Sequence, residues 1–156
     1  MNGINRSRRR AGHDVRPPRP VVVHMSFDYE FDSIGRIATI TPRDGSNLAE
    51  SLRAVRGLAS DIRLEEGIGV LMDLRGVEYS PSWDEADALA AAIARSGVLR
   101  HHRVALLASG PMEFALASMI ASLSGLKGAV VHAFRSVETA KAWLRRASNE
   151  HDQRRH

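Results

Sequence analysis

Asp73 and Ser82 are the residues of this chain best placed to do chemistry. An apolar run ends at Asp73, a short turn follows, and Ser82 opens a helical pattern. This order puts a hydroxyl at a helix start beside the carboxyl end of a strand, where open α/β sheets carry their sites. The carboxylate could orient a ligand, and the serine could accept a phosphoryl group, which a helix N-terminus favours.

Both residues also have a structural interpretation, and the sequence favours it. Ser82 followed by Glu85 forms a capping-box pattern that accounts for both residue types. A phosphate on Ser82 would be repelled by the carboxylates of Glu78, Asp84 and Glu85. Asp73 is expected to accept hydrogen bonds from the turn that follows it.

The other chemistry-bearing residues do not form a catalytic pattern. The chain has no cysteine, so disulfides, thiolate metal sites and a cysteine nucleophile are excluded. It has no Gly-x-Ser-x-Gly elbow and no glycine pattern for phosphates or dinucleotides. His101 and His102 are adjacent, so in an extended strand they would point to opposite faces. Neither His24 nor His132 has ligand spacing around it. We expect no metal, no cofactor and no enzymatic activity.

Charge is unevenly distributed along the 156 residues. Residues 1–24 hold six arginines and one aspartate, whereas residues 25–147 hold 14 basic and 15 acidic side chains. The net charge of +4 therefore comes from the N-terminal segment, and the nearly neutral remainder does not favour nucleic-acid binding. Aromatic residues make up only 5%, so the core is built mainly from Ala, Val, Ile and Leu.

Composition divides the chain into three segments. Residues 1–23 form a basic, proline-rich arm that is expected to be disordered, either a solvated tail, sequence upstream of a start at Met25, or an arm that meets phosphate. Residues 24–147 form one domain, and residues 148–156 form a polar tail. Apolar runs are shorter than the roughly 18 residues of a membrane span, and the start lacks a secretory signal. We expect a cytoplasmic protein without stable membrane insertion.

Periodicity and turn residues predict the element order β-β-α-β-α-β-α-β-α. The first two strands form an antiparallel hairpin, and the later strands alternate with helices, which implies parallel pairing. We predict an α/β fold with a five-stranded, mostly parallel sheet and four helices. The strands are expected over residues 21–31, 36–41, 68–74, 104–108 and 129–134. The helices are expected to start at Asn47, Ser82, Pro111 and Ser136, the first running to Gly67.

The third predicted helix has no charged residue from Phe114 to Leu126. A helix without a charged face is either buried or covers something. It carries a stripe of small residues, which would permit close approach by another surface, and it carries apolar bulk. Deep burial, a homodimer face, an apolar ligand pocket and a gate above a pocket all stay open. The stripe is Ala115, Ser118 and Ser122, and the bulk is Phe114, Met119, Ile120 and Leu123.

Three segments, in this order and spacing, resemble one known family. The last strand ends in Phe134-Arg135 and leads into a helix ending in Ala142-Trp143-Leu144. Residues 103–107 fit that family's central strand, and residues 114–120 fit the helix after it, although the family often has Arg where this chain has Ser118. Over about residues 25–146 the chain resembles the SpoIIAA-like branch of the STAS superfamily, also described as STAS/Sec14-like.

The resemblance implies a binding or regulatory module. The SpoIIAA-like branch generally lacks a demonstrated activity, and its kinship with lipid-binding folds suggests an apolar ligand or membrane contact. In anti-anti-sigma factors a serine after the strand is phosphorylated to release a partner. Residues 73–77 match the start of that motif and Ser82 falls at the acceptor position, but Pro81 replaces the aspartate before it.

We therefore expect a non-catalytic bacterial module that binds an apolar, lipid-like molecule or a protein partner, or forms a homodimer. Binding would use the third helix and the turn at residues 73–85. Alternatives are a phospho-regulated partner switch at Ser82 and, least favoured, nucleic-acid contact through the arginine arm. The candidate binding residues are Asp73, Tyr79, Ser82, Trp83, Phe114, Ser118, Met119 and Ser122.

Overall fold

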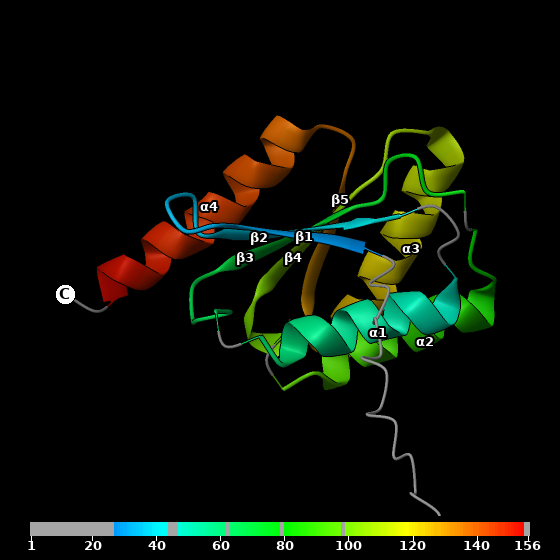
Figure 1. Cartoon of the computed structure of the whole chain (residues 1–156), viewed down its shortest axis with the longest axis horizontal. Helices are drawn as coiled ribbons and strands as arrows, with labels where there is room; N and C mark the ends of the chain where they lie inside the picture. Colours follow the sequence, from blue (N-terminus) through cyan, green and yellow to red (C-terminus); the bar gives the residue numbers. More distant parts are fainter. Residues whose placement is uncertain (1–26, 44–46, 62, 79, 98, 155–156) are drawn as a thin grey trace, which may run out of the picture.

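The computed structural model describes residues 27–43, 47–61, 63–78, 80–97 and 99–154. They form one five-stranded sheet in the order β1-β2-β3-β4-β5, with β1 antiparallel to β2 and the other neighbours parallel (Figure 1). The strands are β1 Phe27–Asp32, β2 Ile37–Pro42, β3 Gly69–Asp73, β4 Arg103–Leu107 and β5 Val130–Phe134. The predicted α/β fold is confirmed. The arginine arm and Met25 lie outside the described residues.

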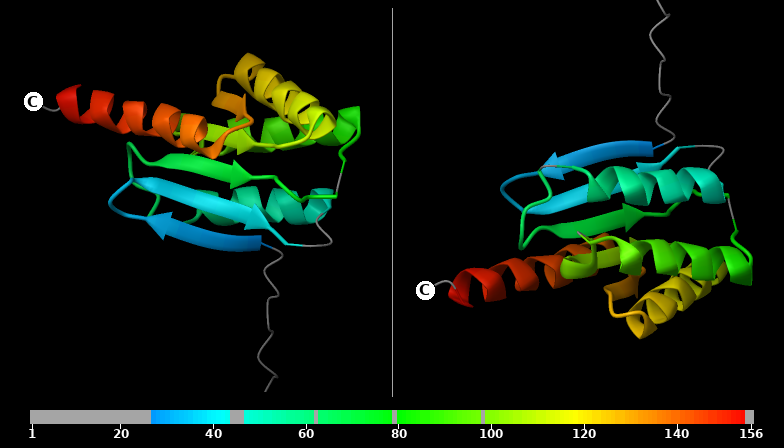
Figure 2. Two further views of the ribbon diagram at one scale, coloured as in Figure 1. Left: turned by 90° about the horizontal axis from the view of Figure 1, so that it is seen from above. Right: turned by 90° about the horizontal axis from the view of Figure 1, so that it is seen from below.

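Helices cover both faces of the sheet. They are α1 Leu48–Ala59, α2 Trp83–Arg95, α3 Pro111–Leu126 and α4 Val137–Arg154, with a short 3-10 helix, η1, at Leu99–His101. In Figure 2, α4 crosses one face, and α1 and α2 lie across the other. Side chains alternate accordingly, with Val70 and Val104 facing α1 to α3, and Leu71 and Ala105 facing α4. Such two-sided burial explains why β3 and β4 read as continuous apolar runs.

The predicted helix starts are confirmed. Asn47 Oδ1 accepts a hydrogen bond from the Glu50 N–H at 3.0 Å. Pro111 occupies the first turn of α3, where its missing N–H costs nothing. Ser136 Oγ accepts from the Thr139 N–H at 3.4 Å at the start of α4. Cap hydrogen bonds thus mark the starts of α1 and α4, whereas α3 begins at Pro111 without a side-chain cap.

The structure adds three details that the sequence did not predict. The first helix ends at Ala59 rather than at Gly67, because Asp61 Oδ1 accepts the Arg63 N–H at 2.9 Å and turns the chain. The adjacent histidines do not share an extended strand, since His101 belongs to η1 and only His102 is buried. α4 runs to Arg154, and so extends into residues 148–156, for which the sequence predicted a polar tail.

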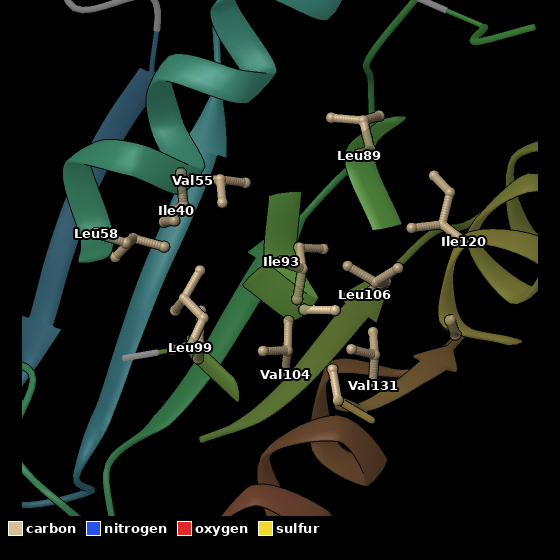
Figure 3. Packing of buried hydrophobic residues seen from close by; sticks show 14 of the residues in the cluster. Ile40, Val55, Leu58, Leu89, Ile93, Leu99, Val104, Leu106, Ile120 and Val131 are labelled. Atoms are coloured by element: carbon tan, nitrogen blue, oxygen red, sulfur yellow. The ribbon is translucent and has the colours of Figure 1, made fainter. Parts of the chain in front are cut away.

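The core is aliphatic and tightly packed (Figure 3). Leu58, Leu99, Val104 and Leu106 are at most 2% exposed. On the α4 face, Gly69 permits a close approach, because a Cβ there would lie 2.8 Å from the Leu144 Cβ. A real Cβ does not approach another that closely, so α4 packs directly on the β3 backbone.

Candidate ligand cavity

A partly enclosed cavity of about 260 Å³ lies at the carboxyl ends of β2 and β3. This is the edge at which parallel α/β sheets bind ligands. A smaller hollow of about 80 Å³ adjoins it and shares Pro42, Ser51, Leu74, Leu89 and Ile120 with it. The larger cavity is lined by Pro42, Ser51, Leu74, Val77, Glu78, Ser80, Pro81, Leu89, Met112, Glu113, Leu116, Ala117 and Ile120.

The cavity wall combines distant parts of the chain. Pro42 comes from the end of β2, Ser51 from α1 and Leu89 from α2. Helix α3 and the loop after β3 supply the rest of the described lining. In Figure 3, Leu89 and Ile120 lie at the rim of the packed layer that contains Leu106. The floor of the cavity is therefore continuous with the hydrophobic core, which gives a bound molecule a rigid apolar surface.

Asp73 fixes the start of the loop that walls the cavity. Its Oδ1 accepts the Arg75 N–H at 3.1 Å and Nε at 2.9 Å, and its Oδ2 accepts Nη2 at 2.7 Å. Burial alone would raise the pKa of Asp73, but these bonds outweigh it and hold the pKa below its usual range. The predicted turn role of Asp73 is confirmed. Asp73 itself does not line the cavity.

Backbone bonds extend this turn into the wall. The Leu74 N–H donates to the Leu107 carbonyl at 2.8 Å, and the Val77 N–H donates to the Leu74 carbonyl at 3.2 Å. Gly76 adopts φ 79°, a left-handed conformation that side-chain-bearing residues rarely take. Leu74 and Val77 are thereby held with their side chains in the cavity wall.

Ser82 caps α2 rather than facing the cavity. Its Oγ accepts the Glu85 N–H at 3.3 Å, and Glu85 Oε2 accepts the Ser82 N–H at 2.8 Å, which completes the predicted capping box. Trp83 is 71% exposed and also lies outside the lining. Of the predicted turn residues, Tyr79 lies outside the described residues. The cavity contacts of this segment come instead from Ser80 and Pro81.

The candidate residues of α3 lie away from the cavity. Phe114 is partly buried beneath the Arg135 guanidinium, 5.6 Å from its ring centroid, and Met119 packs against the core. Ser118 and Ser122 border an open groove of about 550 Å³ between α3 and β5. Ser122 Oγ donates to the Ser118 carbonyl at 2.9 Å, so its hydroxyl is satisfied locally.

Helix α3 is neither fully buried nor fully exposed. Its buried side chains are those of Ala117, Ile120, Ala121 and Ser124, whereas Met112 is 68% exposed. One flank meets the cavity and another meets the groove. The deep-burial interpretation therefore holds for one face only. The pocket interpretation fits the cavity flank of α3, from which the sequence analysis singled out Ile120 but not Met112 or Leu116.

A regular signal did mark the cavity flank. Met112, Leu116 and Ile120 recur at every fourth position and form one row along α3. An apolar row of this spacing is indistinguishable from an ordinary core-facing stripe. The sequence analysis emphasised the stripe of small residues instead, but Ser118 and Ser122 of that stripe lie on the groove flank.

His102 and His132 occupy structural positions. His102 is buried, and its Nδ1–H donates to the Ile68 carbonyl at 2.7 Å. Burial lowers the pKa of His102, because the charged form loses its hydration. The exposed His132 ring stacks on Trp143 at a centroid distance of 4.8 Å. Among the described residues, no three His, Asp or Glu side chains gather as a metal site would require.

No protein-family model, curated protein or solved structure matches this chain. Within the described part of the chain, no helix combines the length and apolarity needed to cross a membrane. The site is therefore argued from its own geometry.

Proposed function

We propose that this protein is a non-catalytic binding module of STAS type that holds a small apolar molecule at the carboxyl edge of its sheet. The cavity beneath the 74–81 loop carries the proposal. Ligand pockets are typically concave and mostly apolar, with a few polar groups that orient the ligand. Here the polar side chains in the described lining are those of Ser51, Glu78, Ser80 and Glu113.

The cavity volume sets the size of the ligand. At about 260 Å³ it exceeds the roughly 150 Å³ of an engineered protein cavity that binds benzene, and it falls just below the roughly 300 Å³ at which drug-sized pockets begin. It suits one aromatic ring with a short aliphatic extension, or a short branched chain. A full-length acyl chain would project into solvent.

A neutral probe of this size tests the proposal. We expect 4-phenylbutan-1-ol to bind the full chain saturably in a 1:1 complex, as measured by calorimetry and by NMR shifts of the Leu74 and Leu116 signals. Leu116→Trp places an indole in the cavity and should lower the affinity at least about tenfold.

Ser118→Trp is the matched control. It introduces the same side chain on the same helix but on the groove flank, so it should leave probe binding unchanged. Absence of binding to the wild-type chain would refute the proposal, and so would equal binding by wild type and Leu116→Trp.

The partner switch at Ser82 stays a prediction with a separate test. Its hydroxyl is exposed, but the Glu85 N–H occupies it, so a phosphoryl group would have to replace the capping box. If the switch operates, Ser82→Asp and Ser82→Ala should differ in the proteins they capture from a lysate of the source cells. Equal capture by both variants would remove it.

A further inference from the structure

The charged side chains of the cavity lining are all of one sign. Glu78 and Glu113 contribute carboxylates, and no lysine, arginine or histidine is present in the lining formed by the described residues. The two arginines next in sequence to lining residues are already neutralised. Arg43 is paired with Asp28, and Arg75 is paired with Asp73 at 2.7 Å.

A helix N-terminus could still attract an anion at this site, because α3 begins beside the cavity. Glu113 opposes this attraction. It lies in the first turn of α3, and its carboxylate occupies the space into which a Cβ on Gly110 would project. A carboxylate in the first turn offsets the positive end of the helix dipole. The helix start therefore does not restore an anion site.

Glu78 is the second carboxylate in the cavity lining. It belongs to the loop that follows β3, and its side chain is exposed at the cavity rim. In the described part of the structure its carboxylate forms no hydrogen bond or ion pair. An apolar molecule seated in the cavity would thus present its polar end to two carboxylates, with no described cation beside them.

From this charge arrangement, and resting on the proposed function, we propose that the natural ligand is a hydrophobic amine. Its apolar body fills the cavity, and its protonated amino group lies at the rim near Glu78 and Glu113. Opposite charges attract across such a rim, whereas a carboxylate or phosphate head would be repelled by both residues. Fatty acids and phospholipid heads are disfavoured by the same argument.

Three probes that share a phenylbutyl skeleton test the head group. They are 4-phenylbutylamine, 4-phenylbutan-1-ol and 4-phenylbutanoate, which carry +1, 0 and −1 charge at pH 7. By calorimetry on the full chain at low salt, the amine should bind about three- to tenfold tighter than the alcohol, and the carboxylate should bind most weakly. Because the chain carries net charge +4, non-specific attraction would give the opposite order.

Removing the two carboxylates should remove the preference. The double variant Glu78→Gln/Glu113→Gln should bind the amine no more tightly than it binds the alcohol. Asp84→Asn is the charge-matched control. It removes an exposed carboxylate from the first turn of α2, outside the lining, and should keep the amine preference.

The outcomes separate the two proposals. If the alcohol binds and Leu116→Trp blocks it, but the amine gains nothing or the carboxylate binds tightest, the amine inference is overturned and the proposed function stands. A preference that survives in the double variant also overturns the inference. If none of the three probes binds, the proposed function itself fails.

Discussion

Helix α3 borders two hollows, a groove and a cavity, which differ in size, in enclosure and in charge. The groove against β5 is the larger, at about 550 Å³, but among the described residues its lining comes from α3 and the segment from Ala129 to Ala133 alone. The cavity has about 260 Å³, and its walls come from β2, the 74–81 loop and three helices. Burial of a small ligand depends on enclosure, so the smaller hollow is the better binding site.

The two hollows also differ in charge. The cavity lining includes two carboxylates, whereas the described lining of the groove has no Asp, Glu, Lys or Arg. The proposed discrimination between charged head groups therefore belongs to the cavity rim, where Glu78 and Glu113 lie. The sequence analysis singled out the small, uncharged residues on the groove flank of α3. The proposed selectivity for a charged head group instead depends on the carboxylates at the cavity rim.

The largest expected effect concerns the core beneath the smaller hollow that adjoins the cavity. Leu106 is 2% exposed and lines the smaller hollow. Leu106→Ala should lower the free energy of unfolding by about 2–5 kcal/mol, because it removes buried methyl groups and enlarges a void. Urea denaturation measures this loss.

The groove provides the contrast for that measurement. Ser122→Ala removes one exposed hydroxyl and should change the free energy of unfolding by no more than about 0.5 kcal/mol. If Leu106→Ala and Ser122→Ala lowered the free energy of unfolding by similar amounts, the two hollows would not differ in how far their walls belong to the core.

A smaller effect is expected at the turn that holds the cavity loop. Asp73→Asn loses the ion pair with Arg75 and should lower the free energy of unfolding by about 1 kcal/mol. It should also weaken probe binding about threefold, since the start of the loop that carries Leu74 and Val77 is then held less firmly. Denaturation and calorimetry on the same variant measure both quantities.

Asp61 supplies a matched control, because the same Asp-x-Arg turn occurs there outside the cavity. Asp61 binds Arg63 through Nε at 3.0 Å and Nη2 at 2.8 Å. These bonds hold the pKa of Asp61 at about 2. Asp61→Asn should reduce stability without changing probe affinity. Equal loss of binding in the two variants would contradict the wall role of the Asp73 turn.

The pH dependence follows from the direction of the pKa shifts. The pKa values of Asp61 and Asp73 lie below the roughly 3.9 of an unfolded aspartate. Their stabilising contribution is therefore complete above about pH 4 and is lost as the pH falls through the folded-state values. His102 acts at higher pH, because its lowered pKa lets the unfolded chain take up a proton first. Stability should already decline as the pH falls below about 6.5.

The change with the smallest expected effect tests the groove directly. Ser118→Lys adds a charge to a partly exposed position and should alter stability by less than about 0.5 kcal/mol. Probe binding in the cavity should be unchanged, while any self-association through this flank should be lost. Sedimentation beside calorimetry measures both. Loss of probe binding would mean that the ligand occupies the groove.

The sequence predicted the features of the fold that depend on residues close together in the chain, such as helix starts. Asn47, Ser82 and Ser136 mark helix starts because each cap is completed within three positions. The end of α1 was missed because Asp61, an ordinary surface residue in the sequence, ends the helix by binding Arg63. Such local competition between side chain and backbone leaves no periodic signal.

The cavity could not be predicted in the same way. Pro42, Leu89 and Ile120 meet only when the strands and helices have packed, and each of them reads as a core residue. Apolar residues that line a void and apolar residues that fill one have the same periodicity. The charge preference of the site depends on the same convergence, since Glu78 and Glu113 lie far apart in the chain.

The close contact between Gly69 and Leu144 has a consequence for synthesis on the ribosome. α4 follows all five strands in the chain, and it covers one face of the sheet, where Ile37, Leu71, Ala105 and Leu107 are buried. Until α4 has left the ribosome, that apolar face has no cover of its own. Nascent chains with exposed apolar surface are prone to aggregation, so this face is where a chaperone would be needed first.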